Sequence, residues 1–175
     1  LKARFKDQIN LASKLTFSKV INSWKLLASY YLSKLLKKPV QWGFPASISF
    51  EPTTSCNLRC PECPSGLRAF TRPRGMLENK FFEKTIVQLK NELHYLTFYF
   101  QGEPYLNPAF LDMVKFAHKN KIYSATSTNG HYLNKEIAQK TIDSGLDRLI
   151  ISIDGTTQET YESYRVGGKL EKALE

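Results

Sequence analysis

Cysteine and histidine are both scarce in this sequence of 175 residues. The three cysteines all lie between residues 56 and 63, so no distant pair could brace the chain as a disulfide. This usage predicts a reducing, cytoplasmic compartment. The three histidines, His94, His118 and His131, do not show the paired spacing of a two-histidine metal site, and we assign them no role on spacing alone.

Long apolar runs are also missing. Within residues 1–40 the longest uncharged run is Leu26 to Ser33, whereas a helix that spans a bilayer needs about 20 apolar residues. Lysines follow this run, where the cleavage site of a signal peptide would have small residues. The sequence therefore predicts neither a membrane span nor a secretory leader in this region.

Acidic residues are almost absent from the first 40 positions. These positions hold nine basic side chains against Asp7 alone, a balance of +8, whereas residues 41–175 hold 16 basic and 15 acidic side chains, a balance of +1. We therefore divide the chain into a basic arm, residues 1–40, and a nearly neutral core domain, residues 41–175.

Apolar residues in the arm recur at helical spacing until Lys38-Pro39 ends the pattern. They are Phe17, Val20, Ile21, Trp24, Leu27, Tyr31 and Leu35. We expect an amphipathic helix whose apolar stripe packs on the core domain or on a further part of the protein. The alternative is peripheral contact with an anionic membrane surface, with Trp24, Tyr30 and Tyr31 at headgroup level. No nucleic acid is expected, because basic residues alone give only an electrostatic footprint.

After a linker around residues 43–45, strand and helix patterns alternate. We expect strands at 46–50, 95–100, 122–126 and 149–153, and helices at 81–93, 108–120 and 134–144. This alternation indicates an α/β fold of parallel strands joined by crossover helices. A cluster of polar residues and glycines follows each strand, and the carboxyl ends of parallel strands share one rim.

The first of these clusters contains Cys56, Cys60 and Cys63 with CxxxCxxC spacing. A [4Fe-4S] cluster normally takes four thiolates, so three would leave one iron open for chemistry. Two other interpretations remain at this point. The cysteines could bind a structural zinc with a histidine as fourth ligand, or they could be ordinary reduced thiols.

The cysteine spacing resembles that of the radical S-adenosylmethionine (SAM) enzymes. The later clusters resemble the SAM-binding segments of that family in the same order along the chain: Gln101-Gly102-Glu103-Pro104, Ser127-Thr128-Asn129-Gly130 and Ser152-Ile153-Asp154-Gly155 followed by Arg165. The resemblance implies that Cys56, Cys60 and Cys63 hold a [4Fe-4S] cluster. It implies that Gly102 and Glu103 hold the amino group of SAM, Ser127 and Asn129 its ribose, and, as in the SPASM-type subgroup, Ser152 and Arg165 its carboxylate.

Two positions depart from the family pattern. Gln101 replaces the first glycine of a Gly-Gly-Glu-Pro segment, and Glu62 stands where an aromatic residue often packs near adenine. Leu58 and Phe70 are candidates for the missing apolar contact.

The resemblance implies a partial (β/α) barrel of the radical SAM type, truncated and preceded by the amphipathic arm. It implies that an external donor supplies an electron for reductive cleavage of SAM to a 5′-deoxyadenosyl radical. This radical would abstract a hydrogen atom from a substrate, for which the candidate class is a peptide or protein. Because about four strands are expected, we predict an incomplete core that binds its cluster weakly and is inactive alone. The alternative function is a non-enzymatic zinc-binding or membrane-surface-associated module.

Overall fold

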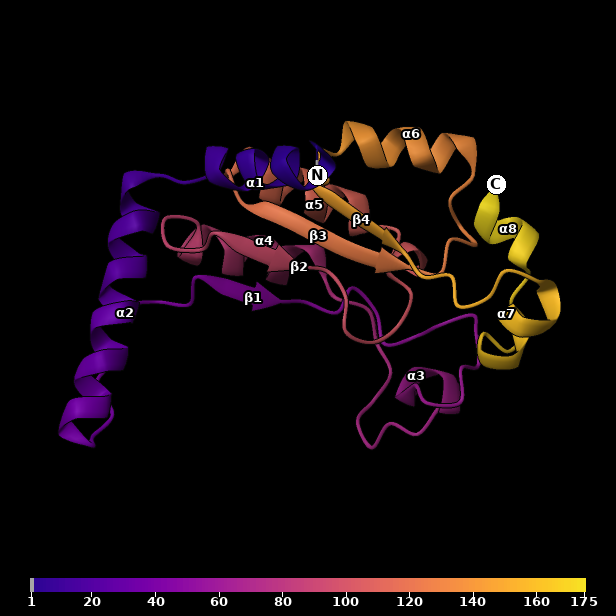
Figure 1. Ribbon diagram of the computed structural model, residues 1–175, viewed down its shortest axis with the longest axis horizontal. Helices are drawn as coiled ribbons and strands as arrows, with labels where there is room; N and C mark the ends of the chain where they lie inside the picture. The colour runs from indigo at the N-terminus through magenta and orange to yellow at the C-terminus, as the bar shows by residue number, and fades with distance from the viewer. Residues whose placement is uncertain (1) are drawn as a thin grey trace.

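The computed structural model describes residues 2–175, and side chains from residue 5. It contains one sheet of four parallel strands in the order β1-β2-β3-β4 (Figure 1). The strands are β1 (Ser47–Ser49), β2 (Tyr95–Thr97), β3 (Tyr123–Thr128) and β4 (Arg148–Ile151). Sequential order with parallel pairing is the start of a (β/α) barrel, because each crossover returns the chain next to the strand it left. The predicted α/β fold class is confirmed.

Helices connect the strands as the alternating pattern predicts. Between strands lie α3 (Pro64–Leu67), α4 (Asn79–Leu89), the 3-10 helix η1 (Pro104–Leu106), α5 (Phe110–Lys119) and α6 (Lys135–Asp143), and after β4 come α7 (Gln158–Tyr164) and α8 (Leu170–Leu174). Helices α4 and α5 form a core with the sheet, in which Phe82 and Ile86 pack with Phe98 and Met113. These apolar contacts fix the strands whose ends carry the polar clusters.

Two element ends differ from the sequence prediction by three residues or more. Strand β2 stops at Thr97, and although Phe98 is buried, Phe100 is 78% exposed. The strand predicted at 95–100 therefore ends three residues early, and Phe100 does not pack within the sheet. Helix α4 ends at Leu89, four residues early, and the carbonyls of Asn91 and Glu92 beyond it accept hydrogen bonds from side chains of the N-terminal arm.

The N-terminal arm forms two helices, α1 (Lys2–Ser13) and α2 (Phe17–Leu36). Helix α2 was predicted; α1 was not. Polar contacts join α1 and the residue after it to the segment that enters β4: Asn10 Nδ2 donates to Asp147 at 2.8 Å, and Lys14 Nζ lies 3.0 Å from the same carboxylate. In Figure 1 the strands run toward α3 and α7, while α2 lies beyond the opposite end. The arm is thus attached away from the rim where the polar clusters meet.

Helix α2 turns its polar side toward the core domain. Lys19, Asn22 and Ser29 are buried, and Lys19 Nζ donates to the Lys121 carbonyl at 2.5 Å. Burial, together with nearby Lys14, lowers the pKa of Lys19 to about 8. The predicted apolar stripe is exposed instead: Phe17 is 82% exposed and Trp24 is 67% exposed. The expectation that this stripe packs on the core domain is therefore wrong.

Within residues 2–175, no helix has the length and apolar character that a membrane span requires.

Candidate functional site

A cavity of about 210 Å³ lies at the carboxyl ends of the strands. Its lining includes all nine site residues predicted from the sequence: Cys56, Cys60, Cys63, Gly102, Glu103, Ser127, Asn129, Ser152 and Arg165. These residues span more than a hundred positions of the chain, and parallel strands bring them to one rim. The structure therefore brings every predicted site residue together.

Each cysteine sulfur has a different polar side chain beside it. Asn129 Nδ2 lies 3.9 Å from Cys56 Sγ, Arg165 Nη1 lies 3.9 Å from Cys60 Sγ, and Cys63 Sγ donates to Gln101 Oε1 at 3.4 Å. Burial raises the pKa of both Cys56 and Cys60. Three thiols facing one cavity, each next to a hydrogen-bonding group, are a donor set that fits an iron-sulfur cluster.

The zinc interpretation requires a histidine beside the cysteines, and each histidine is engaged elsewhere. The ring of His94 contacts the Leu11 carbonyl, the ring of His118 contacts Lys14 Nζ, and Nε2 of His131 accepts from the Lys169 backbone. Among the described side chains, no group of three His, Cys, Asp or Glu residues could hold a single metal ion. The structure therefore does not support the zinc alternative.

Gly102 brings the end of β2 close to the segment that enters the cysteine loop. Its φ is +78°, and a Cβ atom placed there would lie 2.0 Å from the Thr53 carbonyl oxygen. Next to it, the Glu103 backbone N–H donates to the Ser55 carbonyl at 2.8 Å. Only glycine fits this close approach, which sets the distance between the second polar cluster and the cysteines.

Gly102→Ala is expected to destabilise the fold by about 3 kcal/mol or more, because a left-handed φ and a steric clash add together. Gly167→Ala is the matched control: Gly167 has a φ of +81°, but a Cβ atom placed on it would meet nothing within 4 Å. Its cost should be only about 1 kcal/mol. Urea unfolding of both variants measures the difference, and equal costs would show that the close approach to Thr53 is unimportant.

Glu103 is buried and joins the ends of β2 and β3. Its Oε2 accepts from the Asn129 backbone N–H at 2.9 Å, and its Oε1 accepts from Thr128 Oγ1 at 2.7 Å and from the Tyr105 N–H at 3.3 Å. Burial raises the pKa of Glu103, and these donated hydrogen bonds oppose the rise. A carboxylate has about four acceptor sites, so roughly one stays available for a ligand.

The third and fourth polar clusters meet across β3 and β4. Ser127 Oγ and Ser152 Oγ lie 3.0 Å apart, and the guanidinium of Arg165 pairs with Asp154 while it also reaches Cys60. Asn129 Nδ2 donates to Asn57 Oδ1 at 2.8 Å, which links the third cluster to the cysteine loop. Hydroxyl, amide and guanidinium groups thus surround one small polar space.

The cavity also contains residues that we did not predict as site residues. Tyr99, Phe100 and Tyr164 line it, as do Gln101 and Thr128. By contrast, Leu58 and Phe70, our candidates for the missing apolar contact, are not among the lining residues. A signal for Phe100 exists in the sequence, because a residue immediately before a rim cluster can belong to the rim.

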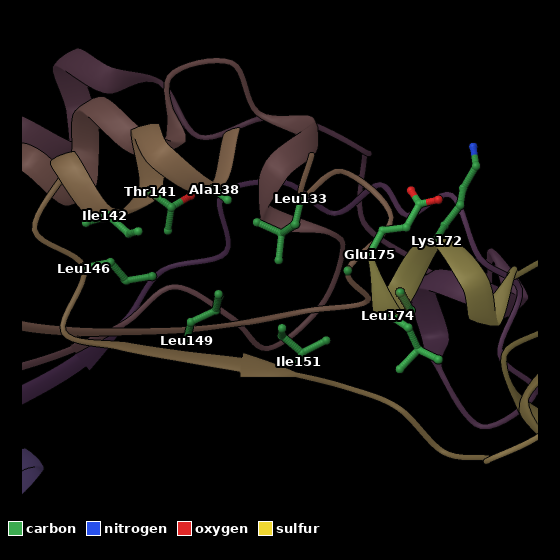
Figure 2. Close-up of a pocket in the computed structure, with 12 residues that line it drawn as sticks. Leu133, Ala138, Thr141, Ile142, Leu146, Leu149, Ile151, Lys172, Leu174 and Glu175 are labelled. Atoms are coloured by element: carbon green, nitrogen blue, oxygen red, sulfur yellow. The ribbon is translucent and has the colours of Figure 1, made fainter. Parts of the chain in front are cut away.

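A larger cavity of about 370 Å³ lies at β4, one of the two edge strands, between α6 and α8. Figure 2 shows Leu146, Leu149 and Ile151 on one side of it and Leu174 near its end. Its lining is apolar apart from Thr141, Lys172 and Glu175 and the Gly130 backbone. Because this cavity lacks the thiols and convergent polar groups of the rim, we do not assign the chemistry to it.

Comparison with known proteins agrees with this geometry. The family model described as "Radical SAM superfamily" matches residues 50–175. An AdoMet-dependent heme synthase of Methanosarcina barkeri is 31% identical over 134 residues, which are 74% of this chain and 37% of the relative. A PqqA peptide cyclase of Gluconobacter oxydans is 30% identical over 125 residues, 71% of this chain and 34% of the relative. The crystal structure of Streptococcus suis SuiB bound to precursor peptide SuiA has the same fold, with a TM-score of 0.58 at 19% identity, covering 77% of this chain and 30% of SuiB.

The chain belongs to the radical SAM superfamily, and the predicted resemblance to its SPASM-type subgroup is confirmed. Enzymes of this family use a [4Fe-4S] cluster and SAM. The chain spans about a third of the length of the curated relatives described above.

Proposed function

We propose that Cys56, Cys60 and Cys63 hold a [4Fe-4S] cluster and that the same cavity binds SAM for hydrogen-atom abstraction from a substrate. The observation that carries this proposal is that all nine predicted residues line one cavity. When bound, such a cluster supplies the electron for reductive cleavage of SAM to a 5′-deoxyadenosyl radical. An external reductant must deliver that electron, which suits a reducing cytoplasmic compartment.

The polar groups of the cavity match the functional groups of SAM. Glu103 keeps an acceptor site for the ammonium group, and Gly102 exposes backbone beside it. Ser152 and Arg165 offer a hydroxyl and a guanidinium to the carboxylate, since a guanidinium can donate two parallel hydrogen bonds. Ser127 and Asn129 offer donors and acceptors to the ribose hydroxyls. The rings of Tyr99, Phe100 and Tyr164 supply apolar surface for the adenine in place of the aromatic residue that Glu62 replaces.

We propose a peptide or protein as the substrate of the whole protein. The support is the similarity to a PqqA peptide cyclase and the shared fold with SuiB, which was crystallised with a precursor peptide. Residues 41–175 then form the core domain that holds cluster and SAM, and residues 1–40 form an arm attached at its far side.

Anaerobic reconstitution tests the cluster site. The chain, incubated with excess iron, sulfide and an equal amount of zinc, should take up about four iron atoms and prefer them to zinc. Because we expect weak retention by this chain, iron and sulfide should be measured without prolonged desalting. Preferential binding of zinc in a one-to-one ratio would contradict the proposal.

We further propose that the arm makes peripheral contact with an anionic membrane surface. The stripe of α2 that includes Phe17, Trp24 and Leu27 is exposed, and exposed lysines such as Lys25 and Lys34 lie on the same helix. An amphipathic helix of this kind lies in the interface, where apolar burial and attraction to anionic lipids act together.

Sedimentation with phosphatidylserine-containing vesicles tests this contact. Trp24→Glu should weaken binding about tenfold or more, because an apolar ring leaves the interface and a negative charge enters it. Trp42→Glu is the control, since Trp42 is similarly exposed but lies outside α2. The proposal would be contradicted if the two substitutions had equal effects, or if the chain bound equally well to neutral vesicles. A dimer in solution that depends on Trp24 would instead show that the stripe contacts a second copy of the chain.

A further inference from the structure

The side chain of Gln101 connects the end of β2 to the third cysteine. Cys63 Sγ donates to Gln101 Oε1 at 3.4 Å, and Ser65 Oγ donates to the same oxygen at 3.1 Å. Ser65 is buried, and its hydroxyl in turn accepts from the Gly102 N–H at 2.9 Å. Gln101 is therefore held by a hydrogen-bonded chain that begins at the glycine on which the cavity depends.

The family pattern has no side chain at this position. Gln101 replaces the first glycine of the Gly-Gly-Glu-Pro segment, so the contact with Cys63 is a property of this chain's own sequence. The other two cysteines have Asn129 and Arg165 beside them. With Gln101 present, each of the three sulfurs has one neighbouring side chain able to donate an N–H.

A metal-bound cysteine has lost its proton and can only accept a hydrogen bond. The Gln101 carboxamide can meet this change by turning over at its last torsion, which exchanges its oxygen for its NH₂ group at nearly the same place. The NH₂ group can then donate to Cys63 Sγ and to Ser65 Oγ, once the Ser65 hydroxyl hydrogen has rotated away. No movement of the backbone is needed.

We propose that Gln101 is a positioning residue that donates a hydrogen bond to the cluster-bound sulfur of Cys63 and thereby raises the reduction potential of the cluster. Reduction adds negative charge that is shared with the sulfurs, so an N–H donor stabilises the reduced form more than the oxidised form. The inference rests on the proposed cluster site and deepens it. It concerns the reduction potential of the cluster, which can be measured without substrate or turnover.

A redox titration with dithionite, followed by electron paramagnetic resonance on anaerobically reconstituted chain, tests the proposal. Gln101→Leu removes the donor at similar size and should shift the reduction equilibrium about tenfold toward the oxidised form, which is about 59 mV for one electron. Gln101→Glu cannot donate when its carboxyl is ionised and then adds repulsion, so its shift should be larger at a pH well above the pKa of that carboxyl. Gln139→Leu, which removes an exposed amide of α6 that binds Asp143, should leave the potential unchanged.

The outcomes separate this inference from the proposed function. If the unsubstituted chain assembles a cluster and both Gln101 variants show the same reduction potential as that chain, the inference is overturned. If the variants then differ from the unsubstituted chain only in a lower melting temperature, the Gln101 contact is merely structural. If the unsubstituted chain takes up no cluster, the proposed function and this inference fail together.

Discussion

Replacement of any one of Cys56, Cys60 or Cys63 by alanine is expected to reduce iron uptake at least about tenfold and to abolish the resonance of a reduced cluster. The reason is the small number of ligands. Each [4Fe-4S] cluster would have three protein thiolates and no spare one, because the sequence holds no other cysteine. The measurement is iron and sulfide per chain after anaerobic reconstitution, together with the visible absorption of the cluster.

Glu62→Gln provides the matched control for these substitutions. Glu62 lies between Cys60 and Cys63 in the same loop and is exposed. The Glu62→Gln substitution should leave iron uptake unchanged, since surface substitutions usually change stability by no more than about 0.5 kcal/mol. If a cysteine variant retains the full iron content of the unsubstituted chain, the assignment of that cysteine as a ligand is wrong.

Glu103→Ala is expected to lower the free energy of unfolding by about 3 kcal/mol or more and to remove SAM binding. The substitution leaves three donors without their acceptor: the N–H groups of Asn129 and Tyr105 and the hydroxyl of Thr128. An unsatisfied buried donor costs about 1–3 kcal/mol. Urea denaturation measures the first effect, and equilibrium dialysis of SAM against the reconstituted chain measures the second.

Glu103→Gln separates stability from ligand binding. It keeps one acceptor oxygen for Thr128 and Tyr105 but places an NH₂ group against the Asn129 N–H, so a smaller loss of stability should accompany the loss of SAM affinity. Glu136→Gln is the control, because Glu136 forms only an exposed pair with Lys140, 2.7 Å apart. Unchanged SAM affinity in a folded Glu103→Gln chain would contradict the role proposed for this carboxylate.

The sequence predicted the sheet because its signals are local. Apolar residues at strand and helix periods mark β1 to β4 and α4 to α6, and parallel pairing follows from their alternation. The end of β2 was harder to predict, since the aromatic run from Phe98 to Phe100 continues the strand pattern although pairing stops at Thr97. Propensity cannot show where a neighbouring strand ceases to pair.

The arm shows a second limit of local patterns. Helix α1 has few apolar residues and is fixed by distant polar partners such as Asp147, which no local period reveals. For α2 the period identified the apolar stripe but not the side that faces the core domain. Backbone carbonyls of distant loops satisfy Lys19 and Asn22, and this makes the polar side the buried one.

The candidate site was largely predictable because polar residues after successive parallel strands must meet at one rim. What the sequence could not give was the pairing of side chains across the rim. Gln101 was recognised only as a departure from a glycine pattern, and its contact with Cys63 depends on the close approach at Gly102. Tyr99 and Phe100 were missed as lining residues because the strand predicted at 95–100 included them.

The central claim is that three cysteines leave one iron open for SAM. Electron paramagnetic resonance of the reduced, reconstituted chain with and without SAM tests it most directly. We predict a [4Fe-4S]⁺ signal whose g values change when SAM is added, because SAM would become a ligand of the open iron. A signal that SAM leaves unchanged, or a reconstituted chain that binds zinc and forms no cluster, would contradict the account.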